Sequence, residues 1–152
     1  MDLAAHLQTA LDVSQAALPA VGRYLIEGGP ELALVCHQVA VYPGPITTAE
    51  IARCAYVTRP GVVVAYTKDC YPMVQTEGGQ ARPPDAAAQT AWSLAYAADV
   101  AALYDGLLEA ALDGTFGMAS DGCASVVVGV ANFSGPRGGA CSVRIPLTIQ
   151  GT

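Results

Sequence analysis

The chain has 152 residues, of which 53% are hydrophobic and only 13% are charged, whereas about a quarter of the residues of an average soluble domain are charged. We therefore expect one domain over residues 1–152 whose weakly charged surface is buried against other subunits, although a plain alanine-rich domain is the alternative. The net charge of −6 and the scattered basic residues argue against tight nucleic-acid binding through phosphate contacts.

The N-terminal segment predicts a helix. Leu3, Leu7 and Leu11 recur at helical spacing, so they form one apolar stripe on a helix over residues 1–18. Pro19 ends or bends this helix because proline lacks an amide donor. The acidic start does not resemble a signal peptide, and no apolar run is long enough to span a membrane, so we expect a cytosol-like compartment.

Two buried strands are expected next. The run ELALVCHQVAVY predicts a strand over residues 31–42 that is buried on much of both faces, and VVVAYTKDC predicts a second one over residues 62–70. Between them, residues 47–54 fit a short helix or a strand equally well. The sequence RPG at residues 59–61 indicates a turn or a bulge.

Residues 71–85 are the most irregular stretch, YPMVQTEGGQARPPD, which contains two glycines, three prolines and no periodicity. A loop of this length inside one domain is usually functional or disordered. We expect a protruding loop that becomes ordered on docking, with Tyr71, Met73 and Val74 as apolar anchors. A disordered surface loop is the alternative.

A long helix is predicted from residues 83–85 to Asp113, because proline favours the first helical turn and the following glycine favours the helix end. Asp105, Glu109 and Asp113 recur every four residues, which indicates a face exposed to water. The side expected to pack consists of Ala88, Ala91, Trp92, Ala95, Ala98, Ala102, Leu103, Leu107 and Ala110.

The C-terminal part predicts two strands, over residues 124–133 and 140–150. In the second, Cys141, Val143, Ile145, Leu147 and Ile149 share one face. The glycine-rich residues 134–139 are interpreted as a hairpin connection, because a phosphate loop needs a following Lys and a helix, and Arg137 alone would hold an anion weakly. Pro146 lacks an amide donor, so we expect the last strand to be an edge strand or to carry a bulge.

These elements predict an α+β fold: a mainly antiparallel four- or five-stranded sheet with an N-terminal helix and one long helix packed on a face. No catalytic pattern is evident. Cys36 and His37 are adjacent, so a strand would point them to opposite faces, and nothing places His6 near them. The dispersed cysteines and two histidines lack metal-site spacing. We expect no cofactor, no metal, no disulfide and no enzyme activity.

Three short motifs follow one another in the order found in one protein family. The strand GVVVAYTKDCYP ends in Cys70-Tyr71-Pro72, and a long alanine-rich helix follows it. Asp121-Gly122-Cys123 then precedes Gly135-Pro136-Arg137-Gly138-Gly139 and a last strand. This order, over about residues 34–149, resembles the tail-terminator or neck proteins of long, non-contractile-tailed bacteriophages, in particular those that infect actinobacteria.

The resemblance implies a structural virion protein, assembled in the host cytoplasm as a homo-oligomer, expected to be a hexameric ring. Such a ring caps the tail tube and contacts the head-completion or stopper protein, and DNA passes through its lumen without specific binding. The expected interface residues are Tyr71, Met73, Val74, Arg82, Arg137 and Pro146. The alternatives are a head–tail stopper, a tube subunit, or a small cytosolic enzyme or ligand-binding domain.

Overall fold

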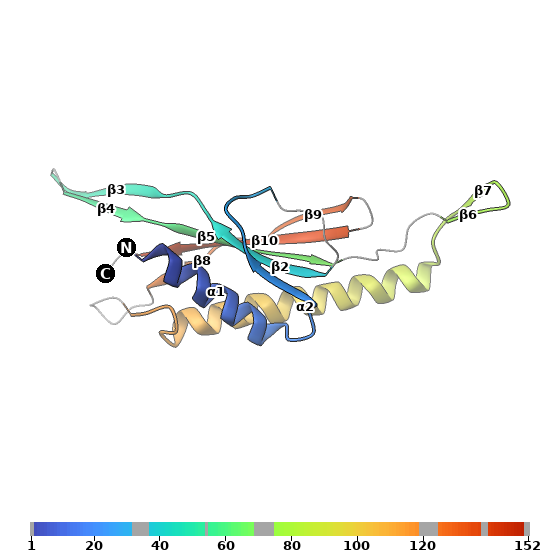
Figure 1. Ribbon diagram of the computed structural model, residues 1–152, viewed down its shortest axis with the longest axis horizontal. Helices are drawn as coiled ribbons and strands as arrows, with labels where there is room; N and C mark the ends of the chain where they lie inside the picture. Colours follow the sequence, from blue (N-terminus) through green and yellow to red (C-terminus); the bar gives the residue numbers. More distant parts are fainter. Residues whose placement is uncertain are drawn as a thin grey trace.

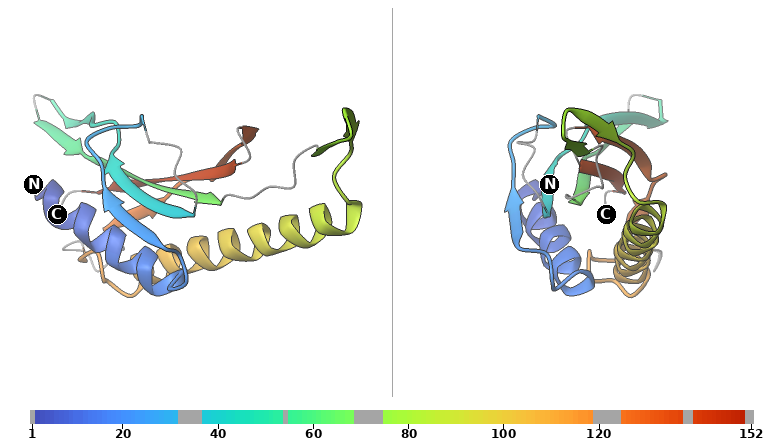
Figure 2. Two further views of the ribbon diagram at one scale, coloured as in Figure 1. Left: turned by 45° about the vertical axis from the view of Figure 1, so that its right-hand side comes forward. Right: turned by 90° about the vertical axis from the view of Figure 1, so that its right-hand side faces the viewer.

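Two helices cover one face of a mixed β-sheet, and two hairpins extend from this body (Figures 1 and 2). The computed structural model describes residues 2–31, 37–53, 55–68, 75–118, 125–137 and 140–150. The helices are α1 (Leu3–Ala17) and α2 (Ala86–Leu112). The sheet contains β1 (Arg23–Ile26), β2 (Gln38–Pro43), β5 (Gly61–Lys68), β8 (Val126–Val128), β9 (Asn132–Arg137) and β10 (Ala140–Ile149). The hairpins are β3 (Thr47–Ala52) with β4 (Ala55–Arg59), and β6 (Gln75–Glu77) with β7 (Gln80–Arg82).

The sheet has the strand order β1–β2–β5–β10–β8, and β9 pairs with β10 beyond the end of β8. Every pair from β2 to β9 is antiparallel, in agreement with the expected α+β fold, but the sheet has six strands where four or five were expected. β1 was not predicted from the sequence, and it runs parallel to β2 at the edge of the sheet. The Tyr24 hydroxyl donates a hydrogen bond to the Leu18 carbonyl, so β1 is tied to the end of α1.

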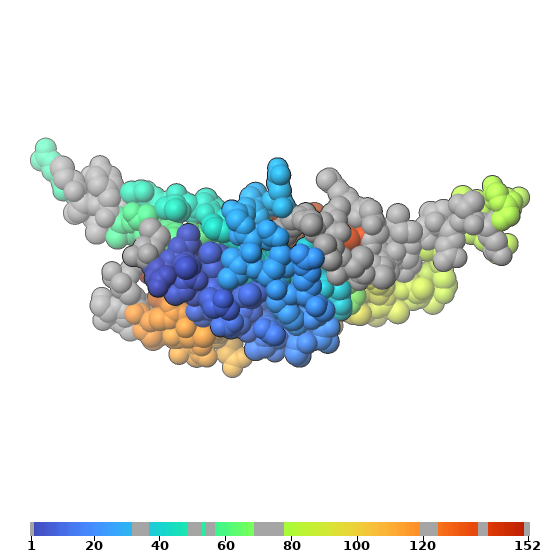
Figure 3. Space-filling view, viewed as in Figure 1, coloured from blue at the N-terminus to red at the C-terminus, as the bar shows by residue number. Residues whose placement is uncertain are grey.

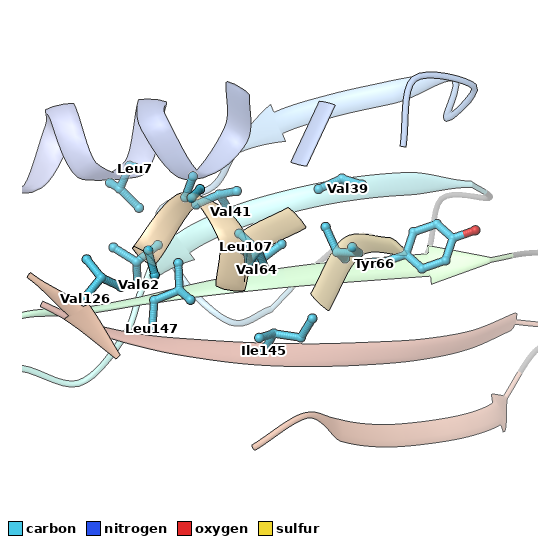
Figure 4. Close-up of a cluster of buried hydrophobic side chains, with 14 of the residues drawn as sticks. Leu7, Val39, Val41, Val62, Val64, Tyr66, Leu107, Val126, Ile145 and Leu147 are labelled. Atoms are coloured by element: carbon cyan, nitrogen blue, oxygen red, sulfur yellow. The ribbon is translucent and has the colours of Figure 1, made fainter. Parts of the chain in front are cut away.

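The core lies between the helices and one face of the sheet (Figure 4). On β10, Val143, Ile145 and Leu147 are buried while Arg144 is exposed, which confirms the predicted alternation. Strand β5 is buried from its first residue to Thr67. Its central place, between β2 and β10, explains why an uninterrupted run of β-branched residues marks it.

Both predicted helices are present, and an aspartate caps the start of each one. Asp2 accepts a 3.0 Å hydrogen bond from the Ala5 amide at the start of α1, and Asp85 accepts a 3.3 Å bond from the Ala87 amide at the start of α2. These carboxylates satisfy amides that have no partner inside the first helical turn, and their charge favours that end of the helix. Helix α2 ends at Asp113, as predicted.

The predicted packing of α2 is confirmed only in its second half, where Leu103, Leu107 and Ala110 are buried together with Val100 and Ala111. Before them, Trp92 is partly exposed, and Ala88, Ala91, Ala95 and Ala98 are exposed, as is Ala102. The 27 residues of α2 span about 40 Å, whereas the 10 residues of β10 span about 33 Å. The helix therefore extends beyond the sheet (Figure 2).

The two hairpins settle one open alternative and correct one expectation. Residues 47–52 form strand β3, one of the two alternatives for this segment, and they pair with β4 outside the main sheet. Within the expected loop over residues 71–85, β6 and β7 form an antiparallel pair. Gly78 and Gly79 join them with φ of +58° and +77°, which suits a two-residue hairpin turn that only glycine adopts without strain. Residues 71–74 lie outside the described residues.

Two predicted strands are shorter than expected. Strand β2 begins at Gln38, because His37 has a φ of +57°, a left-handed conformation that interrupts an extended strand; residues 32–36 lie outside the described residues. The predicted strand over residues 124–133 is divided into β8 and β9, which residues 129–131 separate. Pro60 separates β4 from β5 where a turn or a bulge was expected.

Pro146 lies inside the sheet, so the first of the two expectations, an edge strand, is wrong, whereas the second, a bulge in this strand, agrees with the register shift between Ala140 and Ser142 in the pairing of β10 with β9. Pro146 pairs with Val63 of β5 on one side, and its carbonyl accepts a 2.7 Å hydrogen bond from the Gly129 amide on the other. The amide and the carbonyl of one strand residue point to the same neighbour. The donor that proline lacks therefore faces residues 129–131, where the neighbouring strand is interrupted.

Candidate functional site

The structure does not gather the six expected interface residues into one site. Tyr71, Met73 and Val74 lie outside the described residues. Arg82 is exposed at the end of β7, Arg137 ends β9, and Pro146 is in the interior strand β10. Figure 1 shows the β6–β7 hairpin beyond the start of α2, away from β9 and β10. A different surface, formed by α2 and β9, combines more of the features of a contact site.

This surface is built on residues 86–98, which we call the uncharged segment. They contain no Asp, Glu, Lys or Arg between Asp85 and Asp99, and none of them is buried. Leu94 is 67% exposed. A helix that is apolar on all sides is normally buried, whereas a surface helix keeps polar residues on its outer face. The uncharged segment therefore has the composition of a contact surface.

An aromatic cluster anchors the segment to the sheet. Trp92 and Tyr96 stack with their ring centroids 5.3 Å apart, and Tyr66 of β5 stacks on Tyr96 at 6.1 Å. Phe133 of β9 meets Tyr96 edge to face at 6.4 Å. Such pairs stabilise beyond the area that they bury. They fix the direction in which α2 leaves the sheet.

An ion pair reinforces this anchor. The Lys68 ammonium lies 2.8 Å from an Asp99 carboxylate oxygen, and the Tyr66 hydroxyl donates a 2.6 Å hydrogen bond to the same oxygen. Burial opposes ionisation of Asp99, but the hydrogen bonds from Lys68 and Tyr66 and the Lys68 charge outweigh it, so the pKa of Asp99 lies below its ordinary value. A charged pair thus links β5 to the middle of α2.

Exposed apolar side chains also lie on the sheet edge, on the side of α2 that carries Tyr96, whereas Leu94 is on the opposite face of the helix. Val130, between β8 and β9, is 77% exposed, and Phe133 is 63% exposed. The Tyr104 hydroxyl donates a 3.1 Å hydrogen bond to the Gly129 carbonyl, which holds this edge against α2. The Tyr96 hydroxyl is buried and has no hydrogen-bond partner among the described residues; burial and the nearby Cys141 raise its pKa.

Charge is divided between the two layers. The helices with their capping residues hold seven acidic residues and no Lys or Arg: Asp2, Asp12, Asp85, Asp99, Asp105, Glu109 and Asp113. All seven basic residues lie in strands or, for Arg53, in the turn between β3 and β4: Arg23, Arg53, Arg59, Lys68, Arg82, Arg137 and Arg144. The acidic row on the long helix is exposed, as expected. The helices are therefore acidic, whereas the strands and the β3–β4 turn carry the seven basic residues together with Glu50 of β3 and Glu77 of β6.

The described residues offer little for bond-making chemistry. No group of three His, Cys, Asp or Glu among them is placed to hold a metal ion. His37 lies 6.2 Å from the Tyr66 ring, between ring centroids, and Cys36 is outside the described residues. Cys141 is a free thiol whose pKa is raised by burial, which disfavours the reactive thiolate. No described helix is long and apolar enough to cross a membrane.

Sequence reasoning missed Leu94, Val130 and Phe133. A usable signal was present, because thirteen residues without a charge precede the acidic half of the same helix, but helical spacing alone assigned the alanines to the core. In comparisons with known proteins, no family model matches the chain, and no curated protein matches it.

Proposed function

We propose that the chain is a structural virion protein, a tail terminator whose copies form a ring that caps the tail tube and joins it to the head-completion proteins. The observation that carries this proposal is the exposed surface. The chain exposes 8590 Å², whereas a compact monomer of 15.5 kDa exposes about 7,200 Å². The excess surface suits a subunit that is completed by its neighbours.

The shape of the subunit suits a ring. Figure 3 shows the β3–β4 hairpin and the first half of α2 extending from opposite ends of the body. A contact between such different ends closes into a ring when the rotation permits.

The identity of the ring comes from the motif order that resembles tail-terminator proteins. The net charge of −6 supports the passage of DNA, because a lumen poor in Lys and Arg would not attract phosphates. The free edges of the sheet, β1 on one side and β8 with β9 on the other, are a second means of joining copies, since an unpaired strand edge accepts another strand.

The test is to locate the chain in particles produced from the genome that encodes it. Mass spectrometry of purified particles should recover the chain, and gold-labelled antibody should mark a single point where the head meets the tail. Label along the whole tail would instead identify a tube subunit, and label on tail-less heads would identify a head–tail stopper. Absence of the chain from infectious particles would overturn the proposal.

A further inference from the structure

We propose that the exposed face of the second half of α2 receives the β3–β4 hairpin of the next copy of this chain. The face is built around Asp105, Glu109 and Asp113, which we call the acidic ridge. The inference rests on the proposed function, because it names the contact that would join neighbouring subunits of the ring. It is carried by the shape of the face, by its charge and by the opposite charge of the hairpin.

The acidic ridge lies between two shallow hollows. Its three residues are four positions apart, so they follow one line on the helix surface, about 12 Å long. On one side, Leu108 and Leu112 line a hollow of about 400 Å³, and these leucines are 41% and 66% exposed. On the other side, residues of α1 between positions 13 and 17 line a hollow of about 280 Å³. Glu109 and Asp113 line both hollows, so the ridge and its two flanks form one continuous surface.

The charge of the ridge calls for a basic partner. Like charges four residues apart on a helix repel each other, and α2 contains no Lys or Arg that would offset them. The ridge also lies at the C-terminal end of the helix, where the helix dipole favours cations and disfavours carboxylates. A partner that brings basic groups to the ridge and apolar groups to the leucines beside it would relieve both unfavourable terms and cover the exposed apolar surface.

The β3–β4 hairpin of a second copy has this chemistry. Residues 47–59 contain Arg53 and Arg59 against one acid, Glu50, and Ile46, next to the hairpin, is 57% exposed. The six residues of β3 span about 20 Å, which exceeds the length of the ridge. The two strands pair only with each other and project from the body (Figure 1), and a two-stranded hairpin is marginally stable without a surface to pack against.

The charged groups of the main sheet are less available for this contact. Lys68 is paired with Asp99, and Arg144 donates a 3.1 Å hydrogen bond to the Pro30 carbonyl, whereas Arg53 is exposed in the β3–β4 turn. The hairpin and the ridge are different surfaces of one subunit. A contact between them is therefore head to tail, the kind of contact that a ring of identical subunits uses.

The experiment measures assembly of the full chain by sedimentation velocity between about 10 μM and about 1 mM, where we expect the native chain to form ring-sized species. Glu109→Arg and Arg53→Glu, each alone, should raise the concentration for half assembly at least fivefold, because each replaces an attraction with a repulsion. The chain that carries both substitutions should return to within twofold of the native value. Glu31→Arg is the control, since it makes the same change of net charge at an exposed position that lines neither hollow.

A second pair of variants tests the apolar part of the face. Leu112→Lys should weaken assembly at least fivefold and Leu94→Lys less than twofold, although the two leucines of α2 are 66% and 67% exposed, because they lie about 27 Å apart along the helix. Circular dichroism checks that each variant is folded. A loss in Glu109→Arg that Arg53→Glu does not reverse, or equal losses in the two leucine variants, would overturn the inference, as would a native chain that stays monomeric at about 1 mM. The position of the chain in particles tests the proposed function separately.

Discussion

Asp99 is the residue that joins the sheet to α2 most directly, because it accepts hydrogen bonds from both Lys68 and Tyr66 of β5. Asp99 lies at the point where α2 changes from exposed residues to residues that include the buried ones. Buried residues begin with Val100, immediately after it, and the uncharged segment precedes it. One partly buried carboxylate therefore separates the half of the helix that belongs to the core from the half that faces outward.

We predict that Asp99→Asn lowers the free energy of unfolding by about 1–2 kcal/mol at neutral pH, the range for a hydrogen-bonded charge that is partly shielded from water. The amide keeps the shape of the side chain but loses the charge that Lys68 neutralises. Urea unfolding followed by circular dichroism measures the change. Asp105→Asn, on the exposed side of the same helix, is the control and should be neutral. Equal effects of the two substitutions would contradict the assigned role.

The same carboxylate predicts a pH dependence. The pKa of Asp99 in the folded chain is lower than its ordinary value of 3.8, so the folded state binds fewer protons than the unfolded state in this range. The stability that the pair contributes is fully present above pH 3.8 and is lost as the pH falls below that value. The difference between the native chain and Asp99→Asn should therefore shrink on acidification. A difference that stays constant would argue against ionised Asp99.

At the scale of elements, the packing of α1 against α2 depends on one close approach. A Cβ atom on Gly106 would lie 2.9 Å from the Ala17 Cβ, closer than two carbon atoms pack without a shift. Replacing an interior helix glycine with alanine ordinarily stabilises a helix by about 1 kcal/mol. We predict that Gly106→Ala instead destabilises the chain by about 1 kcal/mol, because the two helices must move apart.

A double-mutant cycle isolates the cause of this effect. In an Ala17→Gly background the steric conflict is absent, so Gly106→Ala should stabilise α2, and the two substitutions should couple by about 1–2 kcal/mol. Urea unfolding of the four chains measures the coupling. Additive effects would mean that the helices are not held at this distance.

The elements that the sequence predicted correctly are those whose signal is local. The alternation on β10 and the start and end of α2 depend on neighbours in the chain. The prediction failed where distant segments decide the structure. Strand β1 exists because it pairs with β2. The exposed half of α2 follows from the length of the sheet beneath it, and the interior position of Pro146 follows from a break in an adjacent strand. The sequence pattern within each of these segments does not indicate the distant element that it contacts.

The exposed half of α2 gives a prediction for hydrogen exchange. In a dilute sample of the chain, amides of residues 90–98 should exchange faster than those of residues 100–112, because the second group holds all the buried residues of α2, whereas the first group contacts the sheet only through its aromatic rings. Mass-spectrometric exchange makes the comparison. Equal protection of both groups would contradict the exposed state of this half.

At the scale of the whole molecule, the division of charge constrains how copies meet. Contact between two helix layers brings acids together, and contact between two strand layers brings together elements that carry all the Lys and Arg residues. The favourable arrangement places a helix layer of one copy near the strand layer of another. These charges act separately from the exposed apolar side chains, which would add contact area but do not set how the copies are oriented.

The last prediction concerns the attraction between the acidic helices and the basic strands. The range of an interaction between exposed charges shrinks from about 10 Å at 0.1 M salt to about 3 Å at 1 M, so assembly of the native chain should weaken several-fold over this range of NaCl. Arg53→Gln removes a charge from the β3–β4 turn and should reduce the salt dependence, without changing the fold, because Arg53 is exposed. Sedimentation at each salt concentration measures both effects. Assembly that strengthens with NaCl would mean that apolar contact alone joins the copies, and that the opposed charges of the two layers do not set their orientation.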